Sequence, residues 1–365
     1  MKRFTNVDTT EFTRMKGLGL MSGTSLDGLD IALCEFQFSG DHLEFEIIRA
    51  ETIKYDAYWI KKLSTAIDLS ESKLSQLHRQ YGYWLADQVI QFLSKTNDTA
   101  DFIASHGHTV RHDPSRGITV QIGNGRCISE RTGLSVVSDF RTENVSAGGQ
   151  GAPLVPIGDL KLFSNFPLCL NLGGIANISI KKDDKIKAFD IASCNIGFNH
   201  FAKLKGLEYD EAGKIGRSGE LSEILFDQLN ALEYYRKQPP KSLDASFFYR
   251  EMMAIIEAHK LNIAAASRTY YEHVAFQIAS VIDDKSQELL TTGGGAYNDF
   301  LIELLKHKHF LNCKIPSKIQ IDFKEALIFA FMGALKLRGE INTLASVTGT
   351  KNDQSTGIVD YPESS

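Results

Sequence analysis

The chain has 365 residues, which is more than one typical hydrophobic core accommodates and suits two domains of ordinary size. Hydrophobic residues make up 43% and charged residues 23%, which are proportions typical of a globular protein. The formal net charge of −5 gives no electrostatic reason to expect nucleic acid or an anionic membrane as a partner.

The cysteines favour a reducing compartment. They are widely spaced and never form a Cys-x-x-Cys pair: Cys34, Cys127, Cys169, Cys194 and Cys313. This spacing argues against a disulfide framework or a cysteine zinc site, and it favours the cytoplasm. No apolar run approaches the roughly 20 residues of a membrane span. Residues 1–15 form a polar extension without the apolar core of a signal peptide, so we expect a disordered tail or a natural start at Met15.

Strands and helices alternate in the first half, which predicts an α/β fold. Residues 17–20 and 29–38 form apolar strands on either side of a small, polar turn, as in a β-hairpin. Apolar residues at helical spacing then predict a helix over residues 70–95, with one buried stripe. Residues 102–105, 118–122 and 134–138 form short apolar runs that predict strands.

The second half opens in the same way after Pro156. Strands are predicted at 168–171, 175–180 and 186–190, with a charged turn at 181–185. Helical patterns cover 245–259 and 266–285, a strand covers 288–292, and a last helix covers 323–338. The small residues of that last helix, such as Ala326 and Gly333, predict a close helix–helix crossing.

The repeated strand–turn–strand opening predicts a duplicated fold with a cleft between two domains. We expect an N-terminal domain of residues 16–150 plus 340–365, preceded by the extension 1–15, and a C-terminal domain of residues 151–339. Each domain should contain a five-stranded mixed sheet with flanking helices.

The turn of the first hairpin reads Gly-Thr-Ser-Leu-Asp-Gly over residues 23–28. Glycines let backbone N–H groups approach a phosphate closely, and hydroxyl side chains add donors. Asp27 could hold a magnesium ion directly or through water. A plain hairpin turn uses the same residue types, so this segment by itself leaves both interpretations open.

Two further glycine-rich segments favour nucleotide binding. Residues 171–177 (Asn-Leu-Gly-Gly-Ile-Ala-Asn) form the second hairpin turn, and Gly293-Gly294-Gly295 follows the strand at 288–292 and opens a helix. A nucleotide can lie against such glycines at a helix N-terminus. The chain has no Gly-x-x-x-x-Gly-Lys-Ser/Thr motif, and no Gly-x-Gly-x-x-Gly follows a strand, so P-loop and dinucleotide folds are disfavoured.

Two phosphate hairpins followed by a glycine-rich turn resemble the actin/Hsp70/hexokinase superfamily, which has a two-domain ribonuclease H-like fold with ATP in the cleft. The closer resemblance is to the anhydro-N-acetylmuramic acid kinase family, and it covers residues 17–358. It rests on residues 21–30 (MSGTSLDGLD), 105–110 (SHGHTV), 121–124 (QIGN), 148–156 (GGQGAPLVP), the hairpin through Asn177, 324–327 (KEAL) and 346–349 (SVTG).

This resemblance implies an ATP- and Mg²⁺-dependent enzyme of bacterial cell-wall recycling in the cytoplasm. The family opens the 1,6-anhydro bond of its amino sugar with water and phosphorylates O6. Residues implied to contact ATP are Gly23, Thr24, Ser25, Leu26, Asp27, Gly28, Leu29, Asp30, Gly173, Gly174, Gly293, Gly294 and Gly295, with magnesium at Asp27. The implied substrates are a small amino sugar and water, and no nucleic acid or membrane partner is implied. A homodimer is possible.

The family's catalytic base corresponds to Asp190, although an aspartate there could instead cap the following helix. The resemblance implies sugar contacts from His106, His108, Asp139, Arg141 and Glu325. Other interpretations stay open for all of these residues, and His106 and His108 could simply be hydrogen-bonded histidines of a polar loop. Asp139 and Arg141 could form a surface ion pair, and Glu325 could simply favour the first turn of a helix.

Two segments depart from the family pattern. Residues 191–195 read Ile-Ala-Ser-Cys-Asn where the family has a glycine- and proline-containing sequence, and residues 243–246 read Leu-Asp-Ala-Ser where it continues toward Gly-Arg-Glu. We expect both on the sugar side, so the substrate could instead be a different amino or anhydro sugar. The sequence is also compatible with a regulatory ATP-binding module, or with a metal-dependent hydrolase built on His106, His108 and His112.

Overall fold

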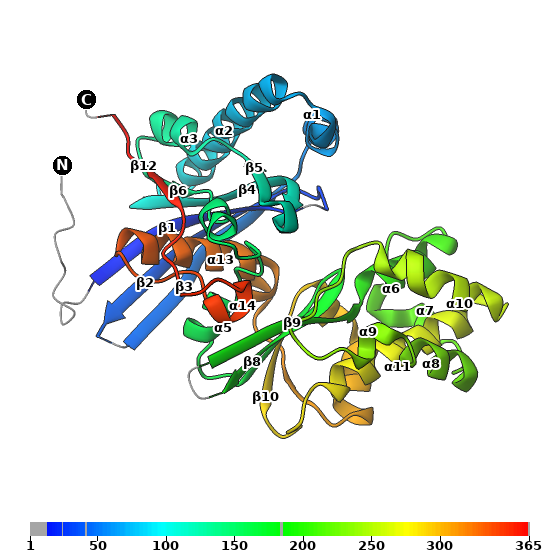
Figure 1. Ribbon diagram of the computed structural model, residues 1–365. Coiled ribbons are helices and arrows are strands. Elements are labelled where there is room, and N and C mark those ends of the chain that lie inside the picture. The colour runs from blue at the N-terminus through cyan, green and yellow to red at the C-terminus, as the bar shows by residue number, and fades with distance from the viewer. Residues whose placement is uncertain (1–12, 24, 41, 183–184, 364–365) are drawn as a thin grey trace. The chain divides into compact units, whose positions relative to one another are not determined.

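The computed structural model describes residues 13–23, 25–40, 42–182 and 185–363 (Figure 1). The predicted ATP contact Thr24, residues 1–12 of the extension, and Asp183 and Asp184 of the charged turn lie outside these residues. The chain divides into unit 1, Met1–Leu162 and Phe323–Ser365, and unit 2, Phe163–Asp322. These boundaries differ from the predicted 150/151 and 339/340 because most of the last long helix belongs to unit 1.

Unit 1 is built on a mixed sheet. Its strands are β1 (Thr13–Ser22), β2 (Leu29–Ser39), β3 (His42–Ile53), β4 (Phe102–Asp113), β5 (Ile118–Ile122), β6 (Ser135–Ser138) and β12 (Ile358–Asp360). Their order is β12-β6-β4-β1-β2-β3, and β5 pairs with β4. The described sheet therefore has seven strands rather than the predicted five, because β3 and β12 add to the five strands that were predicted. The strand β3 was not predicted at all, and β1 begins at Thr13, inside the predicted extension 1–15.

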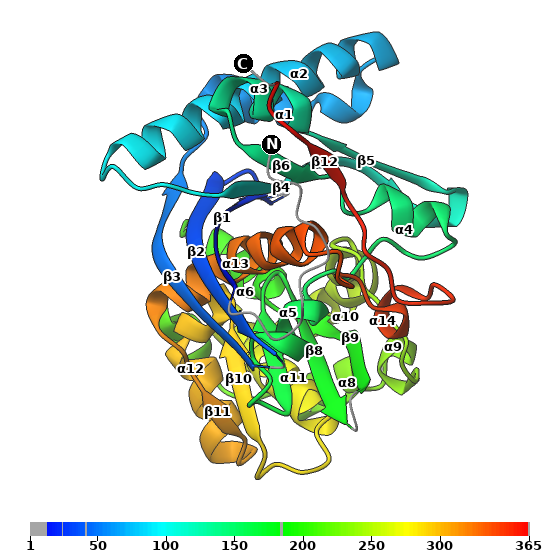
Figure 2. The same ribbon diagram turned by 90° about the vertical axis from the view of Figure 1, so that its left-hand side faces the viewer.

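Alternation along β1 explains how helices pack on both faces of this sheet. Leu18 and Leu20 belong to the core that includes α2 (Glu71–Ser94), whereas α13 (Lys318–Leu337) crosses the opposite face (Figure 2). A Cβ on Gly19 would lie 1.8 Å from the carbonyl oxygen of Ala326, so only glycine permits this approach. The small residues of α13 thus pack against the sheet, which corrects the predicted helix–helix crossing.

The remaining helices of unit 1 are short and lie between or beside the strands. They are α1 (Ala57–Ser64), α3 (Gly125–Thr132), α4 (Thr142–Ser146), α5 (Pro156–Lys161) and α14 (Ala345–Thr348). The helix α13 begins five residues before the predicted position 323 and has non-helical dihedrals at Phe323, where unit 1 resumes. A buried ion pair between Lys324 and Asp159 (2.7 Å) joins α13 to α5 just after this point.

Unit 2 repeats the strand arrangement of unit 1. Its strands are β7 (Leu168–Leu172), β8 (Ile175–Lys182), β9 (Lys185–Ser193), β10 (Glu288–Thr292) and β11 (Asn312–Lys314), in the order β11-β10-β7-β8-β9. The antiparallel strands β7, β8 and β9 correspond to β1, β2 and β3 of unit 1. The parallel strands β7, β10 and β11 correspond to β1, β4 and β6. The predicted duplication and the two-domain α/β fold are therefore confirmed, and this second sheet has the predicted five strands.

Helices surround the aromatic-rich core of unit 2. They are α6 (Asn195–Leu204), α7 (Lys214–Arg217), α8 (Glu223–Asn230), α9 (Glu233–Arg236), α10 (Met253–Ala258), α11 (Ile263–Ser280) and α12 (Asp299–Glu303). The helix predicted over 245–259 is a π-helical turn, Phe248–Met252, followed by α10. Phe198 of α6 and Tyr271 of α11 stack at 3.8 Å between ring centroids, which fixes the two helices against each other.

Candidate active site

Three glycine-rich or loop segments come together in unit 2. Gly293 has φ +82°, and a Cβ there would lie 2.6 Å from Oδ1 of Asn171 in the second hairpin. A Cβ on Gly295 would lie 2.7 Å from Leu172 Cβ and 3.2 Å from Oδ1 of Asn195. Any larger residue would push these segments apart. The fold thus brings the predicted hairpin residues and the Gly293–Gly295 turn into direct contact.

The hairpin residues closest to this turn leave main chain available to a ligand. Gly174 and Gly294 are exposed, and Gly173 is half-buried. Asn195 stabilises the hairpin through two hydrogen bonds. Its Nδ2 donates to the carbonyl of Leu172 at 3.0 Å, and its backbone N–H donates to the carbonyl of Gly173. These glycines could cradle phosphate or ribose groups with their backbone N–H groups.

The first hairpin turn connects β1 and β2 in unit 1. Leu26 has φ +60°, and its N–H donates to the carbonyl of Gly23 at 3.4 Å. A Cβ on Gly28 would lie 2.6 Å from the carbonyl oxygen of Ile53, so β3 packs tightly against the turn. The turn projects Ser25 and Asp27, which are both exposed. Asp27 has no ion-pair partner within the described part of the chain, so its carboxylate is available to a cation.

Asp30 lies at the start of β2, just after this turn. Its Oδ1 accepts a hydrogen bond from the hydroxyl of Thr52 in β3 at 2.6 Å, while Leu29 is buried. The predicted ATP contacts of this segment therefore differ in their surroundings. Asp27 faces solvent, Asp30 is held by a neighbouring strand, and Leu29 belongs to the core of unit 1.

Asp190 lies within β9, which continues to Ser193. The N–H of Leu243 donates to its Oδ2 at 2.9 Å, and the N–H of Asp190 donates to the carbonyl of Lys241. The hydroxyl of Tyr234 donates to its carbonyl oxygen at 2.6 Å. Burial raises the pKa of the Asp190 carboxyl, and the Leu243 N–H opposes this shift.

These contacts exclude one of the two interpretations of Asp190, the helix N-cap. The helix that follows, α6, begins at Asn195 after Cys194, so Asp190 is not its N-cap. Oδ1 of Asp190 has no hydrogen-bond partner among the described residues, whereas Oδ2 is held. One carboxylate oxygen is therefore positioned by the chain and the other is available to accept a proton.

The first departure from the family pattern has mostly buried side chains. The side chains of Ile191, Ala192, Ser193 and Cys194 are buried in unit 2. The N–H of Cys194 donates to the carbonyl of Gly174 at 2.8 Å, so the segment still supports the second hairpin. That this segment lies on the sugar side stays a prediction. The second departure does touch the site, because Leu243 holds Asp190.

His106 and Arg141 form a compact pair in unit 1. Nε and Nη2 of Arg141 lie 3.1 and 2.9 Å from Nε2 of His106, and Nη1 donates to the carbonyl of Gly151 at 2.6 Å. His106 is buried, and burial together with the Arg141 charge lowers its pKa well below the usual range. Burial lowers the pKa of Arg141 to about 10, which leaves the guanidinium charged at neutral pH.

His108 belongs to a separate hydrogen-bonded group. Its Nδ1 lies 3.0 Å from the hydroxyl of Ser22, which accepts a hydrogen bond from Tyr55 at 2.8 Å. The hydroxyls of Tyr55 and Tyr81 lie 2.6 Å apart. All four side chains are buried, and burial lowers the pKa of His108 to about 4. This group connects the start of the first hairpin turn to the core beneath α2.

Asp139 and Arg141 do not pair with each other. Asp139 has φ +53° and accepts hydrogen bonds from the N–H (3.3 Å) and hydroxyl (2.7 Å) of Thr142, so it holds the first turn of α4. The surface ion pair considered for these two residues is therefore wrong. Glu325 is exposed, and its carboxylate interacts electrostatically with Arg141. It follows the non-helical residue Phe323 by two positions, so it lies in the first turn of the helical segment that continues through unit 1, as its second interpretation expected.

The histidine metal site is not supported. The Nδ1 of His112 lies 3.1 Å from the hydroxyl of Thr119, while His106 and His108 have the separate partners described above. Within residues 13–23, 25–40, 42–182 and 185–363, no three His, Cys, Asp or Glu side chains are grouped as metal ligands. In the same residues, no helix combines the length and apolarity needed to cross a bilayer.

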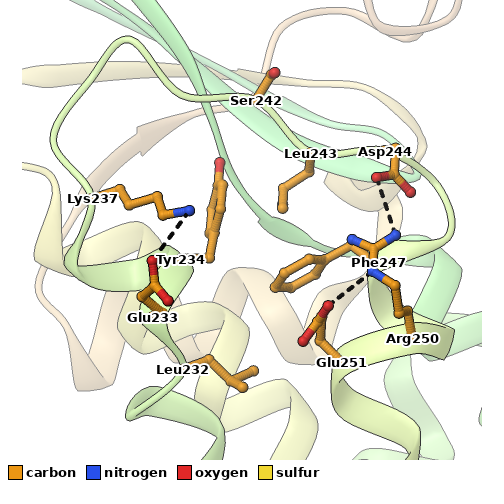
Figure 3. Close-up of a pocket in the computed structure, with 10 residues that line it drawn as sticks. All are labelled: Leu232, Glu233, Tyr234, Lys237, Ser242, Leu243, Asp244, Phe247, Arg250 and Glu251. Carbon is orange, nitrogen blue, oxygen red and sulfur yellow. Dashed lines mark hydrogen bonds and ion pairs between the residues drawn. The ribbon is translucent and has the colours of Figure 1, made fainter.

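Each unit contains a cavity of its own. The cavity of unit 1 has a volume of about 330 Å³, and Asp139, Asn124 and Asp360 are among its lining residues. The cavity of unit 2 has a volume of about 270 Å³, and its wall includes Tyr234 and Leu243, the two residues that hold Asp190. Figure 3 shows Tyr234, Leu243 and Phe247 at its centre, with charged pairs around the rim.

Several residues that form hydrogen bonds to the predicted site residues were not themselves predicted from the sequence. Tyr55, Tyr234 and Leu243 each contact a candidate site residue or its support, but none belongs to a motif. Aromatic and leucine residues in loops are common, so no signal in a single sequence distinguishes them. Their role depends on contacts between segments far apart in the chain.

Comparisons with known proteins identify the family. A model of the family described as anhydro-N-acetylmuramic acid kinase matches residues 15–362. The anhydro-N-acetylmuramic acid kinase of Pseudomonas fluorescens is 34% identical over 367 residues, covering 94% of this chain and 99% of the relative. That of Aliivibrio fischeri is 30% identical over 371 residues, with 95% and 99% covered.

Similar solved structures are more distant. Component A of the (R)-2-hydroxyglutaryl-CoA dehydratase of Acidaminococcus fermentans has a TM-score of 0.45 at 12% identity, covering 89% of this chain and 100% of that chain. The xylulose kinase of Lactobacillus acidophilus has a TM-score of 0.40 at 10% identity, covering 95% and 94%. The match of the family model to nearly the whole chain is decisive, and this chain belongs to the anhydro-N-acetylmuramic acid kinase family.

Proposed function

We propose that this chain is an ATP-dependent kinase that opens 1,6-anhydro-N-acetylmuramic acid with water and phosphorylates its O6, giving N-acetylmuramic acid 6-phosphate for murein recycling. The observation that carries this proposal is the family match over residues 15–362, together with relatives of that name aligned along their full lengths. The residues that the family pattern implied occupy positions consistent with such a site in each unit.

The glycine segments of unit 2 and the first hairpin of unit 1 fit a nucleotide. Gly293 and Gly295 tolerate no side chain, and exposed main chain at Gly174 and Gly294 can donate to phosphate or ribose oxygens. Asp27, exposed and without a described ion-pair partner, is the carboxylate we assign to Mg²⁺. Bound ATP and Mg²⁺ would supply the phosphoryl group and charge neutralisation.

Asp190 is the proposed general base. Its Oδ1 accepts a proton from a water molecule, and the oxygen of this water forms a bond to C1 of the sugar. The bond between C1 and O6 then breaks, and O6 would form a bond to the γ-phosphorus of ATP while the bond from this phosphorus to the β,γ-bridging oxygen breaks and ADP leaves. Leu243 holds the other carboxylate oxygen, so Asp190 presents Oδ1 in a fixed orientation.

Four residues of unit 1 are proposed to contact or orient the sugar. Arg141 and Glu325 offer opposite charges close to each other, and His108 is buried at the start of the first hairpin. Asp139 lines the cavity of unit 1. We place the enzyme in the cytoplasm, because its five cysteines are buried free thiols. A homodimer remains a prediction that light scattering would test.

The test is product analysis with a panel of sugars. The protein is incubated with ATP, Mg²⁺ and 1,6-anhydro-N-acetylmuramic acid, its anhydro-N-acetylglucosamine counterpart, or free N-acetylmuramic acid. In ¹⁸O-enriched water, the product should carry the label at the C1 hydroxyl, read promptly before ring opening exchanges it. Label in free phosphate without phosphosugar would indicate an ATPase and overturn the proposal. Preference for another sugar would overturn the assignment of 1,6-anhydro-N-acetylmuramic acid as the substrate.

A further inference from the structure

The two histidines of the Ser105–Val110 segment have different surroundings, although both were expected to contact the sugar. We propose that His106 is a positioning residue that holds Arg141, and that His108 is the histidine that donates a hydrogen bond to the sugar. This division of roles rests on the proposed function for the identity of the ligand. The roles themselves rest on the hydrogen bonds that each ring makes within unit 1.

The hydrogen bonds of His106 determine its tautomer. Its Nδ1 lies 2.9 Å from the carbonyl oxygen of Gly107, which can only accept, so Nδ1 carries the proton. Its Nε2 faces two N–H groups of Arg141, which can only donate, so Nε2 is an unprotonated acceptor. Both ring nitrogens are therefore occupied within the chain. The ring also lies 4.7 Å from that of Phe329, and His106 has no nitrogen left for a ligand.

Arg141, in contrast, retains donors. A guanidinium carries five N–H groups, of which two point to His106 and one to the carbonyl of Gly151. The remaining two have no hydrogen-bond acceptor within the described ranges. Arg141 enters α4 from the end of β6, and without His106 its long side chain would have one carbonyl to orient it. His106 thus fixes the direction in which Arg141 presents its two remaining N–H groups.

His108 has the opposite tautomer. Tyr55 donates to the Ser22 hydroxyl, so the hydrogen of Ser22 needs another acceptor in a buried setting, and Nδ1 of His108 is 3.0 Å away. Nδ1 is then the acceptor and Nε2 carries the proton. The described residues include no partner for this Nε2–H. His108 is thus a neutral donor beside the first hairpin turn, available to a hydroxyl or carbonyl oxygen of the sugar.

Nuclear magnetic resonance of ¹⁵N-histidine-labelled protein tests the two tautomers directly. We expect the Nδ1–H form for His106 and the Nε2–H form for His108, assigned with His106→Gln and His108→Gln. Saturating 1,6-anhydro-N-acetylmuramic acid without nucleotide should shift Nε2 of His108 and leave the ring of His106 nearly unchanged. An Nδ1–H form of His108, a sugar-induced shift confined to His106, or a response of His108 to nucleotide alone would overturn the proposal.

A double-mutant cycle tests whether His106 acts through Arg141. His106→Leu should raise the sugar KM about 10- to 100-fold, the usual effect of a lost hydrogen bond to a charged group. The ATP KM should change little. In an Arg141→Ala background the same substitution should change the sugar KM by less than about 2-fold, because the residue it positions is gone. Additive losses would overturn the positioning role.

Two further variants keep the result interpretable. His106→Gln places an amide oxygen near the position of Nε2 and should recover most of the sugar affinity even where His106→Leu fails to fold. His307→Gln, an exposed histidine in unit 2, is the matched control and should behave as wild type. A wild-type protein that turns over no anhydro sugar would overturn the proposed function, whereas the tautomers would still decide the assignment of the histidines.

Discussion

Replacing Asp190 with asparagine separates its chemical role from its structural one. Asparagine keeps an oxygen that can accept the hydrogen bond from the Leu243 N–H, now 2.9 Å from Oδ2, so the loop should stay in place. It cannot accept a proton from water at Oδ1. Turnover should therefore fall about 10²- to 10⁴-fold, the usual contribution of a general base. The ATP KM should change by less than about 3-fold, because a base contributes to the transition state rather than to ground-state binding.

The same substitution has a predictable effect on stability. Burial raises the pKa of the Asp190 carboxyl, so the folded state holds its proton more tightly than the unfolded chain does. Wild-type stability therefore decreases as pH rises from the unfolded pKa of about 3.9 through the raised folded value. Asp190→Asn lacks this dependence. At neutral pH the variant should melt at the same temperature as wild type or higher, and the difference should vanish in acid.

Steady-state kinetics with each substrate varied, and thermal melts between pH 4 and pH 8, measure both effects. Tyr234→Phe is the matched control, because the one hydrogen bond that its hydroxyl makes with the described residues is to the carbonyl oxygen of Asp190. It should cost about 1 kcal/mol of stability, the typical value of one hydrogen bond, with turnover within about 10-fold of wild type. A fully active Asp190→Asn variant would refute the assignment of Asp190 as the base, and a variant that melts well below wild type would refute the predicted effect on stability.

Three further predictions concern other parts of the site. Asp27→Ala should abolish or severely reduce turnover with little change in melting temperature, because its carboxylate is exposed; normal turnover at ordinary Mg²⁺ concentrations would exclude it as the magnesium residue. Gly293→Ala should raise the ATP KM and lower the melting temperature, since its φ is +82° and its Cβ would meet Asn171; unchanged values for both would contradict the packing. The folded pKa of His108 is about 4, below its usual 6.5, so stability present above pH 6.5 should be lost as pH falls to 4, by roughly 3 kcal/mol. His108→Gln should reduce this acid loss in urea titrations, and an equal loss in the variant would assign it to other groups.

Much of the fold was predictable from local patterns. The alternation of apolar residues and glycine-rich turns correctly predicted α2, the strand β10 and the repeated hairpin of each unit. These elements have strong periodicity or a turn that only glycine and small polar residues form, so short stretches of chain determine them. The strand β3 was missed because charged residues at alternate positions face solvent on its exposed side, which weakens its apolar signal.

The motifs by themselves determined the family and the candidate residues, because backbone approach to a phosphate and proton transfer each require particular residue types at particular positions. Only the tertiary structure decided what those residues touch. His106 and His108 are two positions apart in the same strand, yet one orients Arg141 and the other adjoins Ser22. Tyr234 and Leu243 hold Asp190 across more than 40 residues of intervening chain. Such contacts depend on how helices and loops pack around a sheet, and packing is set by the shape of the whole core rather than by any local pattern.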